Sequence, residues 1–99
     1  MIFTESEVIE LKSEVVSDLC KEVIAFANTK GGTLYIGVQN DGTVAGIENA
    51  DRITLQVNHM VRDSIRPDVT MFVHYETQEI DGKQILAVTV QKGTGRPYY

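Results

Sequence analysis

The sequence predicts an α+β fold, in which a mixed β-sheet carries two α-helices on one face in the order β-α-β-β-α-β-β. Apolar residues recur with helical spacing over about 18–28 and again toward residue 65, and they alternate with polar residues elsewhere. Glycine-containing turns at 40–42 and 81–82 separate alternating segments, as in strands joined by hairpins. The length of 99 residues suits one small domain with one core.

The first half of the chain predicts a strand, a helix and a second strand. Residues 8–12 predict a short strand because apolar and charged side chains alternate there. Ser17 is the expected N-cap of the helix over about 18–28. Residues 33–39 predict the central strand, in which Val38 should share a face with the two apolar residues that alternate before it.

The second half predicts a short strand, a helix and a hairpin. Residues 43–45 are expected to return as a short strand after the first glycine turn. The second helix should open at Asn49 or Asp51 and end before a proline, which disfavours helical geometry in the residue preceding it. Alternating apolar residues over 69–75 and 86–90 predict the two arms of the hairpin.

The junction at residues 25–38 reads as a helix end, a two-glycine turn and a buried strand. A phosphate-binding loop runs from a strand into a helix, whereas Gly31 and Gly32 follow a helix, whose C-terminal end is partially negative. These glycines are therefore expected to reverse the chain rather than bind an anion. The glycines with a predicted structural role are Gly31, Gly32, Gly37, Gly42 and Gly46.

Composition limits the function classes. Nine basic and fourteen acidic residues give a net charge of −5, which opposes binding to a phosphate backbone. The single cysteine, Cys20, excludes an internal disulfide. The absence of a long apolar run or a signal-peptide pattern predicts a cytoplasmic protein that does not interact with membranes.

Chemistry is most plausible at the acidic start of the chain. Glu10 and Lys12 share one strand face, and a carboxylate beside an ammonium group occurs in metal-dependent nucleases. Glu5 could join them only if the chain bends, and the alternative is a solvated face with a weak ion pair. His59 and His74 have no partner at metal-ligand spacing, so no metal site is predicted from the residues alone.

Several motifs resemble the Schlafen AlbA_2 family, also called divergent AAA-4, a domain family of bacterial transcriptional regulators to which DNA binding is ascribed. The motifs are E-S-x-x-I-E-L-K at 5–12, A-F-A-N-T-x-G-G-x-L-x-I-G-V at 25–38, D-G-x-V-x-G-I at 41–47, I-R-P at 65–67 and R-P-Y-Y at 96–99. The resemblance covers nearly the whole chain. It implies one Schlafen AlbA_2-like domain over 1–99, truncated at its C-terminal end because the family domain normally continues, with C-terminal domains absent from the chain.

The resemblance implies a non-catalytic nucleic-acid-binding module that contacts DNA or RNA as part of a full-length regulator. The cations available for phosphate contacts are Lys30, Arg52, Arg62, Arg66, Lys92 and Arg96.

Two alternatives remain open. Vertebrate Schlafen relatives cleave RNA with three acids, which implies a ribonuclease that uses Mg²⁺ or Mn²⁺ with Glu5, Glu10, Lys12 and Asp41. The third acid lies just after the Gly-Val strand in those relatives, where this chain has two amides and Asp41 is displaced. The other alternative is a homodimeric assembly domain that pairs through an edge strand and two terminal tyrosines, for which the sequence predicts no place in the core.

Overall fold

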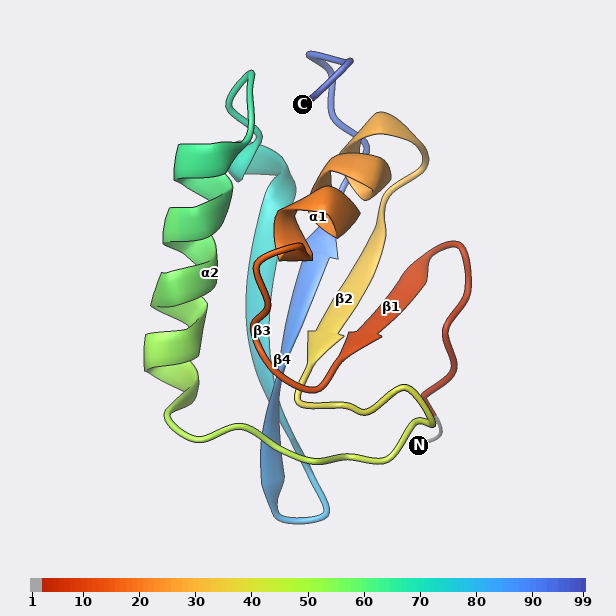
Figure 1. Ribbon diagram of the computed structural model, residues 1–99, viewed down its shortest axis with the longest axis vertical. Coiled ribbons are helices and arrows are strands. Elements are labelled where there is room, and N and C mark those ends of the chain that lie inside the picture. Colours follow the sequence, from red (N-terminus) through yellow and green to blue (C-terminus); the bar gives the residue numbers. More distant parts are fainter. Residues whose placement is uncertain (1–2) are drawn as a thin grey trace.

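The computed structural model describes residues 3–99 and has four strands and two α-helices. The mixed sheet has the strand order β1-β2-β4-β3, with β1 parallel to β2 and the other neighbours antiparallel. Both helices lie on one side of the sheet (Figure 1), which confirms the predicted fold class. The elements are β1 (Ile9–Lys12), α1 (Leu19–Asn28), β2 (Gly32–Ile36), α2 (Ala50–Ser64), the 3₁₀ turn η1 (Thr70–Phe72), β3 (Val73–Ile80) and β4 (Lys83–Val90).

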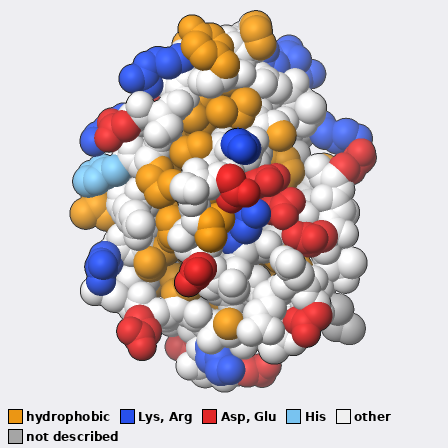
Figure 2. Space-filling model, viewed as in Figure 1, with side chains coloured by type: hydrophobic (Ala, Val, Ile, Leu, Met, Phe, Trp, Pro, Cys, Tyr) orange, Lys and Arg blue, Asp and Glu red, His pale blue; other side chains and the backbone are white. Residues whose placement is uncertain are grey.

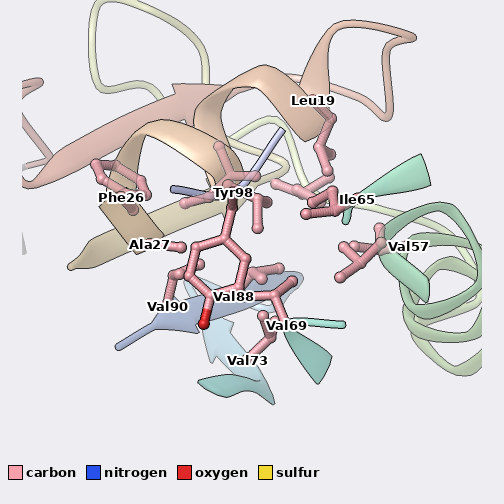
Figure 3. Close-up of a cluster of buried hydrophobic side chains, with 14 of the residues drawn as sticks. Leu19, Phe26, Ala27, Val57, Ile65, Val69, Val73, Val88, Val90 and Tyr98 are labelled. Atoms are coloured by element: carbon pink, nitrogen blue, oxygen red, sulfur yellow. The ribbon is translucent and has the colours of Figure 1, made fainter. Parts of the chain in front are cut away.

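The main core lies between the helices and the sheet (Figure 3). Leu34 and Ile36 of β2 and Val88 of β4 are fully buried against the apolar sides of α1 and α2. Burial of such side chains contributes about 2 kcal/mol each. The helices are therefore held mainly by tertiary packing, as expected for helices of this length.

A smaller core covers part of the opposite face of the sheet and contains Phe3, Leu11, Val38 and Ile85. Val38 was expected on the same face as Leu34, and that prediction is wrong. The reason is Gly37, whose φ of +103° breaks the regular alternation at the end of β2. The N–H groups of Gly37 and Val38 both donate to the Lys12 carbonyl, at 2.8 and 3.2 Å, as in a bulge.

The predicted boundaries hold at some elements and shift at others. Asn49 caps α2, since its side chain accepts a hydrogen bond from the Arg52 N–H at 3.2 Å. The N-cap of α1 is Asp18 rather than Ser17, and it makes no side-chain capping bond. The segment 43–45 contributes a single bridge, between Val38 and Val44, in place of a strand.

The first arm of the hairpin begins later than the alternation suggests. The Asp68 carboxylate accepts hydrogen bonds from the N–H and hydroxyl of Thr70, at 3.0 and 2.8 Å, and this turn leads into η1. Val69 is therefore buried while Met71 is 75% exposed, and regular strand geometry starts only at Val73. The Asp81-Gly82 turn lies where it was predicted, between β3 and β4.

The C-terminal segment docks onto the end of α1. Tyr98 is 3% exposed and lies in the main core, so the expectation that both terminal tyrosines lack a place there is wrong for Tyr98 (Figure 3). The Asn28 side chain accepts from the Tyr98 N–H at 2.7 Å and donates to the Tyr98 carbonyl at 3.0 Å. Tyr99 remains 74% exposed.

The junction after α1 is crowded at both glycines. Gly31 has a φ of +82°, and a Cβ there would lie 2.6 Å from the Val90 carbonyl oxygen. A Cβ on Gly32 would lie 2.5 Å from the Phe26 ring. The remaining predicted structural glycines, which are Gly37, Gly42 and Gly46, have positive φ, as Gly31 does. Within residues 3–99, no helix is long and apolar enough to span a membrane.

Candidate functional site

The N-terminal segment folds back along β1 and brings Glu5 to the side of Glu10. Ser6 and Ile9 face each other across a tight turn, in which the Ser6 N–H donates to the Ile9 carbonyl at 2.9 Å. The reversal lets the Glu5 carboxylate accept a hydrogen bond from the Leu11 N–H at 3.2 Å. Glu5 therefore lies beside Glu10 because the chain bends between them. The sequence predicted that Glu5 could join Glu10 only if the chain made such a bend.

Glu5 and Glu10 share a hydrogen bond, and their pKa values move in opposite directions. Burial is the main cause that raises the pKa of Glu10 to about 7, followed by the hydrogen bond that protonated Glu10 donates to Glu5 and by the negative charges of Glu22 and Glu5. The bond to Glu10, and then the Leu11 N–H, lower the pKa of Glu5. Between the two pKa values the pair therefore holds a single proton, which lies mainly on Glu10.

Lys12 completes this group, which we call the acidic turn and define by Glu5, Glu10 and Lys12. The Lys12 Nζ lies 3.8 Å from the Asp18 carboxylate, and its side chain is only 20% exposed. Its positive charge lowers the pKa of both glutamates, although other causes outweigh it at Glu10. The structure thus brings three of the four predicted catalytic residues together.

The fourth predicted catalytic residue, Asp41, belongs to a separate turn. Its carboxylate accepts a hydrogen bond from the Thr43 N–H at 2.9 Å. Among residues 3–99, no three Asp, Glu, His or Cys side chains lie close enough to hold one metal ion. Within residues 3–99, Asp41 therefore does not join Glu5 and Glu10 in one group of three acids.

The surface around the acidic turn is unfavourable for phosphate. A hollow of about 360 Å³ lies between the turn and α1, and its walls include Glu7, Glu10, Glu22 and Lys30. Carboxylates gather near the middle of the face shown in Figure 2. The Lys30 ammonium group is already paired with the Glu7 carboxylate at 2.6 Å. Negative potential therefore dominates at this hollow.

The predicted nucleic-acid-binding cations, except Arg52, lie at one end of the molecule, where the C-terminal ends of α1, α2 and β4 meet (Figure 1). Backbone bonds join these segments, since Gly93 donates to the Ala27 carbonyl at 2.9 Å. Arg66 and Tyr99 exchange two further bonds, of 2.7 and 2.8 Å. We call this surface the cationic end and define it by Lys30, Arg62, Arg66, Lys92 and Arg96; Figure 2 shows Lys and Arg side chains around it.

The cations of this end differ in how far they are neutralised. Arg62 pairs with Asp63 at 3.1 Å, as Lys30 does with Glu7. The Arg66 guanidinium donates to two backbone carbonyls at the end of α2, at 3.0 and 3.3 Å, and its positive charge contributes to the lowered pKa of Asp63 and of Asp68. Within residues 3–99, Lys92 and Arg96 form no ion pair. Arg66, Lys92 and Arg96 therefore form no ion pair within residues 3–99, and Lys92 and Arg96 are the least compensated cations of this end.

Arg52 is separated from the cationic end by the length of α2. It lies in the first turn of that helix and contributes to a surface hollow of about 580 Å³ that also includes Leu55, His59 and Asp63. His59 and His74 lie on α2 and β3 respectively, and neither belongs to a metal-binding group within the described residues.

The sequence identified these cations but did not predict that five of them would lie at one end of the molecule. The five residues come from three stretches that are far apart in the chain, around 30, 62–66 and 92–96. The sequence did contain one indication of this grouping, because most of these cations lie near the C-terminal end of a helix or strand. Lys30 follows α1, Arg62 and Arg66 lie on either side of the end of α2, and Lys92 follows β4. Which of these ends point the same way depends on the connection of the strands and helices.

The four-stranded mixed sheet with two helices on one side defines a small α+β fold. A family model described as Schlafen, AlbA_2 matches residues 5–99, which is nearly the whole chain. The chain therefore belongs to the Schlafen AlbA_2 family.

Solved structures share the fold. The N-terminal domain of a RecG-related protein from Nitrosomonas europaea, described as an ATP-dependent DNA helicase relative, is 25% identical with a TM-score of 0.81. The match covers 98% of this chain and 72% of that one. A Corynebacterium diphtheriae protein is 20% identical with a TM-score of 0.69, and the match covers 93% of this chain but 19% of that protein. No curated protein matches the chain.

Proposed function

We propose that this domain is a non-catalytic nucleic-acid-binding module that contacts DNA or RNA phosphates through the cationic end. The observation that carries the proposal is the separation of charge within a molecule whose net charge is −5. Arg66, Lys92 and Arg96 follow the ends of α2 and β4 and form no ion pair within residues 3–99, while the acidic turn lies at β1 and the segment before it. A cluster of positive charges at one end of a molecule attracts a negatively charged ligand even when the net charge of the molecule is negative.

Screening limits the distance over which the carboxylates of the molecule oppose binding. Charges in water at physiological salt are screened over about 8 Å, so exposed charges farther away than this contribute little. A phosphate at the cationic end is therefore influenced mainly by the charges beside it. The net charge of −5 slows approach over long distances but does not prevent local binding.

The family and the Nitrosomonas europaea relative support this function in general terms. That relative is described as related to a DNA helicase, and a module that holds DNA suits such a protein. We extend the proposal to a role within a larger bacterial protein that regulates transcription. In that setting, neighbouring domains would supply sequence preference, because phosphate contacts carry none by themselves.

A salt titration of binding to a fluorescent DNA or RNA oligonucleotide tests the proposal. The logarithm of the binding constant should fall linearly with the logarithm of salt concentration, because each neutralised phosphate releases counterions. Lys92→Gln with Arg96→Gln should weaken binding and reduce the slope by about 2 on duplex DNA. Lys92→Gln alone should reduce the slope by about 1, and Arg52→Gln is its matched single-charge control at the other end of α2, which should leave the slope unchanged.

Two results would contradict the proposal. A binding constant that does not respond to salt would exclude phosphate neutralisation. An equal loss of binding in Arg52→Gln and in the double variant would show that the cationic end has no special role.

A Schlafen-type ribonuclease has less support from the geometry. The acidic turn does unite Glu5, Glu10 and Lys12, but Asp41 lies in another turn and no metal-binding group of three forms within residues 3–99. We expect no difference between wild type and Glu10→Ala when structured RNA is incubated with Mn²⁺ or Mg²⁺. Cleavage by the wild type that disappears in Glu10→Ala would restore this alternative.

A further inference from the structure

The two edge strands of the sheet differ in whether another part of the chain covers them. At the β1 edge, the N-terminal segment covers the strand, because Ser6 pairs with Ile9 and the Glu5 carboxylate takes the Leu11 N–H. At the other edge, β3 pairs only with β4 within residues 3–99. One edge is thus closed by the chain itself while the other presents an uncovered strand.

The hairpin register shows which backbone groups of β3 are free. The two-residue turn makes Ile80 and Lys83 a hydrogen-bonded pair, and such pairs alternate along an antiparallel ladder. The Phe72 carbonyl accepts the Gln91 N–H at 2.8 Å, which is in phase with this alternation. The N–H and C=O groups of Tyr75, Thr77 and Glu79 therefore point away from β4.

Strand β3 has only its two glutamates, Glu76 and Glu79, among the devices that usually protect an edge. Between Val73 and Ile80 it has eight continuously paired residues, with no proline, lysine or bulge. A hollow of about 390 Å³ runs beside it under α2 and is lined by Thr77, Leu55 and Asp51, among others. Leu55 is 55% exposed, so the hollow offers apolar surface next to the free backbone groups.

The charges at this edge select the kind of partner. Glu76 and Glu79 lie on β3, Asp81 follows it, and Asp51 lines the hollow. The nearby Lys83 donates to the Val44 carbonyl at 3.3 Å. A second copy of the chain would bring two acidic edges together, and like charges across paired strands are destabilising. A cationic strand would meet opposite charges instead.

We propose that the β3 edge binds an extended, cationic segment of a partner protein, which adds a strand to the sheet. The main chain of that segment would pair with Tyr75, Thr77 and Glu79, as in other cases of strand addition. Its apolar side chains would lie on the helix side of the sheet, in the hollow beside Leu55, and its lysine or arginine side chains would lie on the opposite side, where Glu76 is. This surface is separate from the cationic end and does not depend on nucleic-acid binding.

A blocked heptapeptide of alternating lysine and valine serves as the probe, with binding followed by amide hydrogen exchange and fluorescence anisotropy. In the free protein, the amides of Tyr75, Thr77 and Glu79 should exchange quickly, while those of His74, Glu76 and Gln78 are protected by β4. Saturating peptide should slow exchange at the first set by at least tenfold. The same peptide with glutamate in place of lysine should not bind.

Variants separate the backbone and charge contributions. Thr77→Pro removes an outward N–H without removing a β4 bond, so it should abolish binding in a folded protein, whereas Thr77→Val should bind normally. Glu76→Lys with Glu79→Lys should weaken binding at least fivefold. Glu7→Lys with Glu22→Lys changes the net charge equally at the β1 side and should have a much smaller effect.

Three outcomes would overturn the proposal. The peptide could fail to protect the outward amides of β3. The glutamate peptide could bind as well as the lysine peptide. Finally, these amides could become protected with rising protein concentration alone, which would identify a second copy of the chain as the occupant of the edge.

Discussion

At the scale of single residues, Glu10 is the side chain whose protonation depends most on the fold. Its pKa rises from an ordinary value of 4.5 to about 7, mainly through burial. The folded state therefore binds more protons than the unfolded state between these values. Stability contributed by this proton is fully present below pH 4.5 and is lost as the pH rises through 7.

The free energy of unfolding should therefore fall as the pH is raised from about 5 to about 8, and Glu10→Gln should remove this fall. We expect a change of about 1 kcal/mol, smaller than the full pKa shift implies because solvent screens a partly exposed group. Urea denaturation at a series of pH values measures it. Glu14→Gln, which alters an exposed carboxylate, is the control; an unchanged pH dependence in Glu10→Gln would contradict the assignment.

Asn28 is the second residue with an effect beyond its own position. Its amide makes two hydrogen bonds to the backbone of Tyr98, at 2.7 and 3.0 Å, across 70 positions of sequence. Asn28→Ala should lower the free energy of unfolding by about 1 to 3 kcal/mol, since it leaves both partners unsatisfied in a partly buried place. Thr29→Ala, which removes one exposed bond to the Ala25 carbonyl, should cost much less. Equal losses in the two variants would contradict a special role for Asn28.

At the scale of elements, backbone conformation and close packing explain the glycines of the helix–glycine–strand junction, and no ligand is needed to explain them. Gly31 has a φ of +82° and packs against the Val90 carbonyl, so a side chain there is opposed both by conformation and by contact. Gly82 has a similar φ of +78° but no atom within 4 Å of the position of a Cβ. The two glycines therefore separate the cost of conformation from the cost of contact.

Gly31→Val should lower the free energy of unfolding by more than about 3 kcal/mol, whereas Gly82→Ala should cost about 1 kcal/mol, because only conformation opposes it. Thermal and urea denaturation measure both. If Gly31→Val keeps the melting temperature but loses nucleic-acid binding, the junction belongs to a binding site and its structural role is refuted.

At the scale of the whole molecule, the cations, the carboxylates and the unpaired strand edge occupy different surfaces. The cationic end lies where α1, α2 and β4 end, and the acidic turn covers the β1 edge. The β3 edge is uncovered and acidic. A phosphate ligand and a cationic strand could therefore be bound at once. The salt titration and the peptide experiment test these two surfaces independently, because Lys92 and Arg96 are altered in one and the β3 residues in the other.

The sequence predicted the parts of the fold that depend on local patterns. Helical spacing of apolar residues located both helices, and the Asp81-Gly82 turn located the hairpin. It failed where a distant contact or a single backbone angle decides the outcome. Gly37 moved Val38 to the opposite face, and the pocket that receives Tyr98 is built by segments that the sequence keeps apart.

The candidate sites show the same division. Sequence alone determined the family, the two helices and the set of residues that could carry chemistry, because those follow from residue types and their spacing. Only the tertiary structure decided that Glu5 meets Glu10 while Asp41 does not, and that five cations share one end. The physical reason is that such groupings depend on where the chain turns back and which element ends coincide, and these are fixed by packing around the common core rather than by neighbours in the chain.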